Sequence, residues 1–260
     1  MKHGLYVPNF GVFADPSAVA ELAVVAEETG WDGLFVWDHV VRAEGDFDLA
    51  DPWTLLASVA IATSRLTIGP LITPLPRRRP WNVAKSSVTL DHLSNGRMVV
   101  GVGAGTIRGP EFAAFGEETD PRVRGDMLDE GLAIVRAAWT GAPVSHTGVH
   151  YRIDGQRFLP RPVRGHIPIW GATERLSGRP VRRAATLDGI FPIGIRPTDV
   201  PAMLEHIAQF RPAGSEGYDV VVTGTDDPAP WHDTGVTWWL RLLAFDQPIA
   251  DAISCVRSGP

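Results

Sequence analysis

The sequence of 260 residues contains a single cysteine, Cys255, so the chain cannot form an internal disulfide. A protein of this length buries enough surface to fold without such cross-links. One cysteine in a chain of this size is typical of a reducing, cytoplasmic location. Long apolar runs are missing too, since none approaches the roughly 18 residues of a membrane-spanning helix, and no secretory signal pattern opens the sequence. We therefore expect a cytoplasmic protein with no membrane partner.

An excess of positive charge is also missing. The formal net charge is −6 at pH 7, with acidic and basic residues interspersed along the chain. Proteins that bind nucleic acid concentrate lysine and arginine on one face. The charge pattern predicts no nucleic-acid partner, and a small-molecule substrate is the partner that we expect.

Short apolar or β-branched runs alternate with longer segments of helical period along the whole chain. The expected strands are residues 3–8, 32–37, 65–73, 97–103, 166–170, 188–193, 218–224 and 235–243. The expected helices are residues 16–30, 52–63, 82–93, 122–140, 181–186, 199–210 and 248–257, with a turn or two between the last two strands. Eight such units in about 250 residues match an α/β protein whose parallel sheet closes into a (β/α)8 TIM barrel. We predict one such domain over residues 1–260, with an open doubly wound sheet as the alternative.

The stretch MVVGVGAGTIRG, residues 98–109, resembles a dinucleotide-binding loop at first sight. That motif requires G-x-G-x-x-G between a strand and a helix. From Gly101 the third glycine is replaced by Thr106, the frame from Gly103 fails as well, and Pro110 interrupts the region of the expected helix. The spacing excludes an NAD site here. Glycines at the end of a barrel strand serve ligand access or close packing, and the sequence leaves both explanations open.

Lysine and paired histidines are scarce. The only two lysines, Lys2 and Lys85, fall outside the carboxyl ends of the predicted strands, where barrel enzymes place their reactive groups. This excludes an aldolase that forms a Schiff base. No His-x-His pair occurs, and His39 is the only histidine at a strand end, so we predict no metal site.

Few reactive side chains follow the predicted strands. Asp38 and His39 follow the second strand, Thr73 ends the third, Thr106 follows the fourth and Thr173 the fifth. A site at the carboxyl ends of the strands that contains hydroxyls, one Asp–His pair and aromatic walls suits an aromatic, anionic cofactor that supplies its own chemistry.

Several stretches resemble the luciferase-like oxidoreductases, which are barrel enzymes that use FMN or the deazaflavin F420. The stretches are GWDGLFVWDH, TIGPLITPLPRRRPWNVAKSSVTLDHLSNGR, VVGVGAG, MLDEGL, IPIWGAT and RRAATLDGIFP. TLDHLSNGR is the most specific of them, and the resemblance runs along nearly the whole chain. Many members carry a helical insertion and are longer, so the resemblance implies a barrel without a large insertion and with an open substrate pocket.

The resemblance also implies where the cofactor ring lies. Family members hold the ring against a bulge at the end of the third strand that contains a non-prolyl cis peptide bond, which by position falls at Pro70–Leu71. Thr73 is expected to form a hydrogen bond with the ring edge. Asp38 and His39 correspond to the catalytic pair that approaches the ring, with His39 as a proton donor or general acid–base near the reactive edge.

The loop after the fifth strand resembles the segment that receives the cofactor phosphate. The residues expected to bind there are Gly171, Ala172, Thr173, Ser177 and Gly178. Backbone amides and the start of the following helix form a suitable site for an anion.

Gly105 and Thr106 complete the expected cofactor site. One deazaflavin-dependent branch of the family has a catalytic acid where this chain has Thr106, whereas the Asp38–His39 pair is closest to that branch. Both reduced FMN and F420 therefore remain candidates. We predict a luciferase-like monooxygenase that uses reduced FMN and oxygen, with F420-dependent hydride transfer and non-catalytic flavin binding as alternatives. The family further implies a homodimer and, for FMN, a separate flavin reductase.

Overall fold

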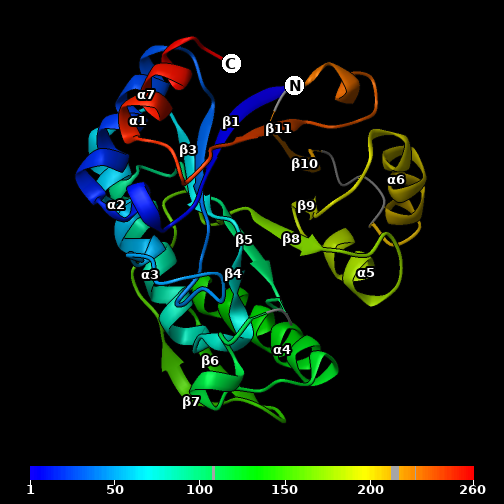
Figure 1. Ribbon diagram of the computed structural model, residues 1–260. Helices are drawn as coiled ribbons and strands as arrows, with labels where there is room; N and C mark the ends of the chain where they lie inside the picture. The colour runs from blue at the N-terminus through cyan, green and yellow to red at the C-terminus, as the bar shows by residue number, and fades with distance from the viewer. Residues whose placement is uncertain (107–108, 212–216, 226) are drawn as a thin grey trace.

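The computed structural model describes residues 1–106, 109–211, 217–225 and 227–260, and parallel strands form its centre (Figure 1). The strands are β1 (Lys2–Val7), β2 (Gly33–Val36), β3 (Thr67–Pro70), β4 (Thr73–Pro74), β5 (Val100–Gly103), β8 (Ile169–Thr173), β9 (Gly189–Pro192), β10 (Asp219–Gly224) and β11 (Trp238–Leu242). Their order is β3-β2-β1-β11-β10-β9-β8-β5-β4. β3 lies within the third expected strand, residues 65–73, and β4 begins at its last residue. Ile68 of β3 also pairs with Met98 just before β5. The sheet thus closes on itself, which confirms the predicted TIM barrel.

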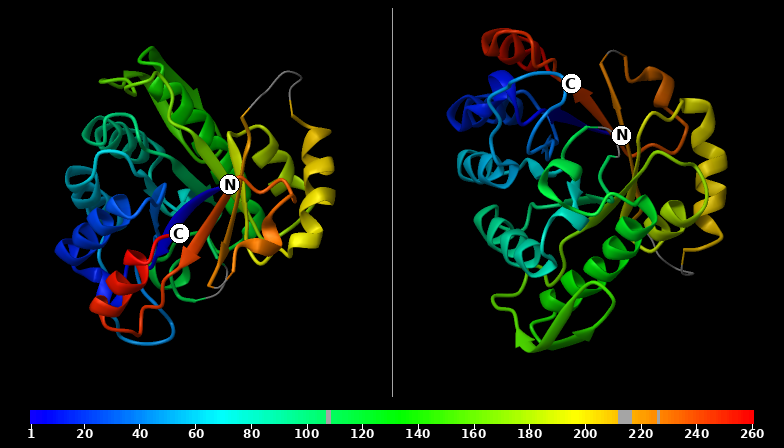
Figure 2. Two further views of the ribbon diagram at one scale, coloured as in Figure 1. Left: turned by 90° about the horizontal axis from the view of Figure 1, so that it is seen from above. Right: turned by 60° about the horizontal axis from the view of Figure 1, so that its bottom comes forward.

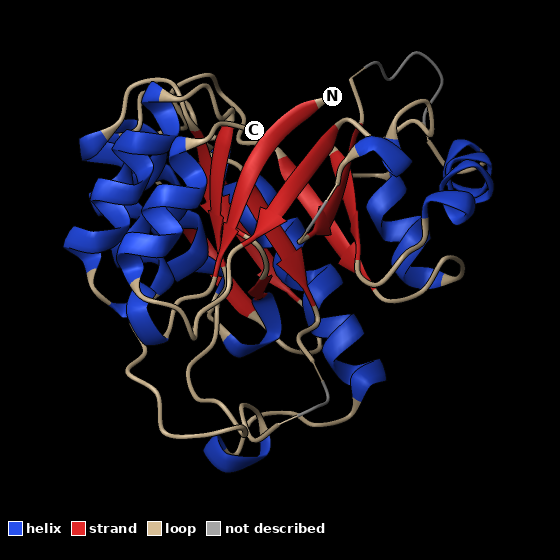
Figure 3. Ribbon diagram, turned by 45° about the horizontal axis from the view of Figure 1, so that its top comes forward, coloured by secondary structure: helices blue, strands red, loops and turns tan. Residues whose placement is uncertain are grey.

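Helices cover the outside of the barrel on opposite sides of the strands (Figure 3). They are α1 (Pro16–Glu28), α2 (Pro52–Ala62), α3 (Pro80–Leu93), α4 (Pro121–Trp139), α5 (Arg179–Ala185), α6 (Val200–Ala208) and α7 (Ile249–Arg257). Between β10 and β11 the described residues contain a single 3-10 turn, Ala229–Trp231, as the short spacing predicts. Across the described ranges, none of the helices has the length and apolar character needed to cross a bilayer.

An Asp-Pro pair starts three of the helices. The side chains of Asp15, Asp51 and Asp120 accept hydrogen bonds from backbone N–H groups in the first turns of α1, α2 and α4, and the proline that follows occupies the first helical position. The carboxylate satisfies a donor that has no partner within the helix, and proline has no N–H to leave unsatisfied. The local sequence therefore sets these three starts.

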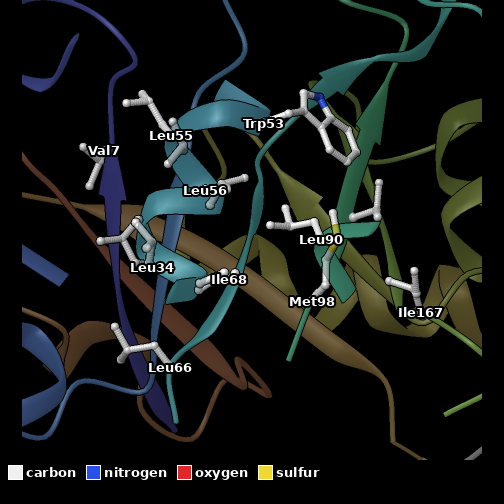
Figure 4. Close-up of a cluster of buried hydrophobic side chains, with 14 of the residues drawn as sticks. Val7, Leu34, Trp53, Leu55, Leu56, Leu66, Ile68, Leu90, Met98 and Ile167 are labelled. Carbon is white, nitrogen blue, oxygen red and sulfur yellow. The ribbon is translucent and has the colours of Figure 1, made fainter. Parts of the chain in front are cut away.

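Two apolar layers hold the barrel together. Inside it, the rings of Phe35, Trp170 and Trp238 contact one another with centroid distances of 5.1 to 5.6 Å. Between the strands and the helices α1 to α3 lies a larger cluster that includes Leu34 and Leu56, both fully buried (Figure 4). The interior rings fill the barrel below its mouth, so ligands are confined to the carboxyl ends of the strands.

A hairpin outside the barrel has no counterpart in the sequence prediction. Its strands β6 (Pro143–Thr147) and β7 (Arg152–Arg157) are antiparallel and lie beside α4 (Figures 1 and 2). Glu130 of α4 holds it, because its carboxylate accepts hydrogen bonds from the Tyr151 N–H at 2.7 Å and from the ring of His146 at 2.8 Å. The hairpin is therefore fixed by contacts between segments far apart in the sequence.

The non-prolyl cis peptide bond lies at Leu71–Ile72, one bond later than the predicted Pro70–Leu71. The Leu71 N–H still donates to the carbonyl of Val36 at 2.8 Å, so pairing with the β2 segment continues through Leu71. The Leu71 side chain is fully buried, whereas Ile72 is partly exposed. The strand is therefore interrupted after Leu71, and the residue that it presents at the mouth is Ile72.

The glycines at the end of β5 serve close packing first. A Cβ atom on Gly101 would lie 2.5 Å from Leu71 Cδ1 and 2.7 Å from the carbonyl oxygen of Pro70. On Gly103 it would lie 2.6 Å from Ile72 Cδ1. Both glycines thus let the third strand, at its interruption, pack directly against β5.

Barrel closure at β3 should depend on Gly69. A Cβ atom there would lie 1.9 Å from the carbonyl oxygen of Val99, so alanine would force the strands apart. We expect Gly69→Ala to lower the free energy of unfolding by about 3 kcal/mol, the upper part of the range for overpacked cores. Urea unfolding followed by circular dichroism measures this.

Gly45→Ala is the matched control, since a Cβ on Gly45 makes only an ordinary contact at 3.5 Å with Phe47. Equal stability losses in the two variants would mean that the close approach at Gly69 is not what limits the fold.

Candidate active site

His39 lies at the mouth of the barrel, just after β2. Its ring packs edge-on against Phe10 and Trp37, with interplanar angles of 70° and 60° and centroid distances of 6.2 and 5.7 Å. Asn9, which is fully buried, donates to the carbonyl of His39 at 2.8 Å and accepts from its N–H at 3.2 Å. A buried amide from the end of β1 therefore fixes the backbone of His39, and aromatic rings fix the side chain.

The two ring nitrogens of His39 have different partners. Nδ1 lies 3.1 Å from Glu111 Oε2, and Nε2 lies 3.1 Å from Arg42 Nη1. A guanidinium group can only donate, so Nε2 must be the acceptor of that bond. The proton of a neutral ring then resides on Nδ1 and is donated to Glu111. The contacts thus select a neutral imidazole whose lone pair, on Nε2, is covered by Arg42.

Arg77 connects the carboxylates of the site. Its Nη2 lies 2.7 Å from Asp38 Oδ1, and its Nη1 lies 2.9 Å from Glu111 Oε1. Arg78 contacts Asp38 as well, at 2.9 Å, and the Asp38 side chain is completely buried between the two guanidinium groups. Asp38 therefore reaches His39 through Arg77 and Glu111 and does not contact its ring directly.

Glu111 is a charged side chain of the candidate site that the sequence analysis missed. It lies in the loop between β5 and α4, is 4 % exposed, and accepts a hydrogen bond from the Val40 N–H at 2.7 Å. Burial by itself raises the pKa of this carboxyl, but the hydrogen bonds from His39 and Val40, with the charges of protonated His39 and of Arg77, lower it to about 2. Glu111 is therefore a carboxylate at neutral pH. In the sequence it appears only as an acidic residue five positions after Thr106, and no local motif has this spacing.

The ends of β4, β5 and β8 form a surface with few side chains. A Cβ on Gly103 would lie 3.6 Å from the Cβ of Ala172 on the neighbouring strand, and Ile72 borders the same surface. Thr73 is fully buried, and its Oγ1 has no hydrogen-bond partner among the described residues. Small side chains beside an unpaired hydroxyl suit a flat ring with a polar edge. These residues therefore fit a flavin-type cofactor.

Gly105 and Thr106 form the turn that leaves this surface. Gly105 has a φ of +79°, and a Cβ there would lie 2.6 Å from the ring of Phe112. Arg124, which is 1 % exposed, donates to the carbonyl of Thr106 at 3.0 Å and lies 4.3 Å from the centroid of the Phe112 ring. A cation buried in α4 thus fixes the loop that carries Glu111.

The expected phosphate loop divides into buried and exposed parts. A Cβ on Gly171 would meet Leu187 at 2.9 Å and Ala184 of α5 at 3.2 Å, so Gly171 lies on the helix side of its strand. The hydroxyl of Thr173 accepts from the N–H of Arg175 at 2.9 Å and starts the turn. Ser177 and Gly178 are exposed, directly before α5. The geometry brings Ala172 and Thr173 to the mouth, whereas Gly171 packs under a helix.

Comparison with known proteins places this geometry in a family. The profile of the luciferase-like monooxygenases matches residues 3–225. The chain belongs to that family.

Its relatives within the luciferase-like family include two F420-dependent glucose-6-phosphate dehydrogenases. The enzyme of Nakamurella multipartita is 33% identical over 203 residues, which cover 74% of this chain and 58% of the relative. The enzyme of Amycolatopsis mediterranei is 32% identical over 218 residues, which cover 82% of this chain and 62% of the relative. The chain therefore spans about three-fifths of their length. An uncharacterised protein of Mycobacterium tuberculosis is 29% identical over 261 residues, which cover 91% of this chain and 90% of that protein.

Solved structures of the luciferase-like fold superimpose along most of the chain. An F420-dependent secondary alcohol dehydrogenase, in complex with an F420–acetone adduct, matches with a TM-score of 0.83 at 18% identity. The match covers 100% of this chain and 98% of the dehydrogenase. A type II Baeyer–Villiger monooxygenase of Pseudomonas putida, in complex with FMN, matches with a TM-score of 0.67 at 21% identity. The match covers 86% of this chain and 67% of the monooxygenase. These likenesses support the fold, and the family match places the chain among the luciferase-like proteins.

The pKa of Glu111 predicts how the site responds to acid. Its folded value of about 2 is below the ordinary value of 4.5, so the carboxylate stabilises the folded state fully above pH 4.5 and loses this effect as the pH falls toward 2. We expect Glu111→Gln to lower the free energy of unfolding by about 3 kcal/mol at pH 7, with a smaller difference from the native protein below pH 4.5. Urea unfolding at a series of pH values measures this difference.

Glu28→Gln, at an exposed position on α1, serves as the control and should change stability little at any pH. A stability difference for Glu111→Gln that stays constant from pH 7 to pH 3 would contradict the assigned pKa.

Proposed function

We propose that this luciferase-like protein is an F420-dependent oxidoreductase that transfers a hydride between the deazaflavin and the carbon of a small alcohol or carbonyl compound. The observation that carries the proposal is the pairing of His39, whose Nδ1–H is donated to Glu111 and whose Nε2 lone pair accepts from Arg42. Oxidation of an alcohol moves a hydride from carbon and a proton from oxygen, so it requires a base beside the hydride acceptor.

His39 and Glu111 together form such a base. Nε2 accepts the hydroxyl proton once the substrate oxygen replaces Arg42 as its partner. The ring then carries a positive charge, which the carboxylate of Glu111 stabilises from the Nδ1 side at 3.1 Å. Arg77 holds Glu111 in place, and the low pKa of Glu111 keeps the proton on the imidazole. In the reverse direction the same nitrogen returns the proton to a carbonyl oxygen.

The mouth supplies groups to hold the cofactor. Thr73, with its unpaired hydroxyl, would contact the polar edge of the ring, and Gly103 and Ala172 would lie against its face. Thr173, Ser177 and Gly178 are the residues that we assign to the phosphate. When bound, F420 accepts or donates the hydride, so the protein itself needs no redox-active side chain.

A monooxygenase reaction with reduced FMN and oxygen is the second candidate. The description of the family and the FMN-bound Baeyer–Villiger enzyme with the same fold support it. The named relatives with 32% to 33% identity are F420-dependent, which favours the deazaflavin. The FMN reaction would further require a flavin reductase to supply the reduced cofactor.

Cofactor titration tests the proposal directly. We expect oxidised F420 to bind the purified protein with a change in its own fluorescence, and to bind more tightly than oxidised or reduced FMN. Thr73→Val removes the hydroxyl at nearly constant volume and should weaken F420 binding by about tenfold, the effect of one buried hydrogen bond.

Thr89→Val on the outer face of α3 is the matched control and should leave binding unchanged. Tight binding of reduced FMN together with oxygen consumption would support the monooxygenase. A protein that binds neither cofactor would overturn both candidates.

His39→Ala should separate catalysis from binding. Loss of a general base lowers turnover by about 100-fold or more, whereas the affinity for F420, held by other residues, should change little. Steady-state reduction of F420 with a series of secondary alcohols measures turnover, and fluorescence titration measures affinity.

His232→Ala, at an exposed position, is the control. If His39→Ala weakened cofactor binding as much as turnover, His39 would be a binding residue and the proposed proton transfer would be wrong.

A further inference from the structure

A pocket lies beside the arginines that contact Asp38. It has a volume of about 390 Å³ and is bordered by the start of α2, the turn before α3, the first part of α4 and the hairpin loop. Arg77 and Arg78 form its inner wall, and their guanidinium groups contact Asp38 on the other side. The side chain of Arg77 therefore links this pocket to Glu111, and Glu111 in turn contacts His39.

Hydrogen-bond donors dominate the lining of this pocket. Arg79, Asn82 and Ser86 are exposed to it, and Trp53 and Tyr151 are 9 % and 4 % exposed. Trp53 Nε1 and the hydroxyl of Tyr151 have no hydrogen-bond partner among the residues that the structure describes. Buried polar atoms in proteins are nearly always paired, so two unpaired donors beside one cavity indicate a ligand with acceptor atoms.

The charges around the pocket favour an anion on one side. Arg78 is held by Asp38, with Asp51 at 3.7 Å, whereas Arg79 has no ion-pair partner within the described part of the chain. Glu117 is the one acidic residue in the lining. Burial raises the pKa of Tyr151 against the opposing charge of Arg79, so the phenol stays protonated and able to donate. Arg79 is thus the free cation of the pocket, and Glu117 opposes it.

We propose that this pocket binds the anionic group, a phosphate or a carboxylate, of a small molecule other than the redox cofactor. Arg79 supplies the charge, and Trp53, Asn82, Ser86 and Tyr151 supply neutral donors. A planar guanidinium group binds either oxyanion through paired hydrogen bonds. The residues assigned to the cofactor phosphate lie on the loop before α5, outside this lining. The proposal therefore does not depend on the identity of the cofactor.

Calorimetric titration of the protein without added cofactor tests the proposal, with inorganic phosphate and succinate as probes and chloride at matched ionic strength as the blank. We expect at least one of the two anions to bind. Arg79→Gln should weaken that binding by about tenfold, since it removes a charged hydrogen bond. Tyr151→Phe should weaken it by about threefold, since it removes a neutral one.

Glu117→Gln gives the decisive contrast because it removes the opposing charge and should tighten binding. A loss of folding cannot produce this effect, and unchanged urea midpoints would confirm that each variant is folded. Arg257→Gln, an equal charge change at an exposed site on α7, should leave binding unchanged.

Three results would overturn the proposal. The first is that neither anion binds the native protein. The second is that Arg257→Gln weakens binding as much as Arg79→Gln, which would mean that the anions respond only to net charge. The third is that Arg79→Gln weakens F420 or FMN binding as much as anion binding, which would make the pocket part of the cofactor site.

Discussion

The candidate active site depends on one guanidinium group, that of Arg77, which bridges two buried carboxylates. Asp38 follows β2 and Glu111 lies in the loop after β5, and Arg77 contacts both with distances of 2.7 and 2.9 Å. Removal of one partner from such a buried pair typically costs about 3–5 kcal/mol, because the remaining charge is left uncompensated. The bridge therefore ties three loops at the mouth into one unit. It also places a fixed negative charge on the Nδ1 side of His39, which agrees with the tautomer that carries its proton on Nδ1.

The two sides of the mouth have complementary characters. On the side of β4, β5 and β8, glycine and alanine leave a flat surface with one unpaired hydroxyl, which suits a ring that brings its own redox chemistry. On the side of the arginines, charged groups are held by hydrogen bonds and ion pairs, which suits proton transfer and recognition of polar substrates. His39 belongs to the charged side, where its ring nitrogens contact Glu111 and Arg42. The proposed anion pocket extends the charged side outward, with Arg77 and Arg78 as the shared wall.

Much of the fold follows from patterns that extend over only a few residues. Alternating apolar runs marked the eight strand positions, and Asp-Pro pairs marked three helix starts. The hairpin of β6 and β7 was not predicted, because it is held by Glu130 from a helix and not by a strong pattern of its own. The cis peptide bond was assigned one residue too early, since the backbone hydrogen bond of Leu71 to Val36 is a contact between strands.

The sequence by itself determined the barrel, the family resemblance and the presence of His39 and Thr73 at strand ends, because hydrophobic period and local motifs act between near neighbours in the chain. Only the tertiary structure decided what each polar group contacts. Glu111 reaches His39 across 72 positions, and Arg77 reaches Asp38 across 39. Their roles exist only because closure of the barrel brings the strand ends together, and burial there makes pairing between charges obligatory.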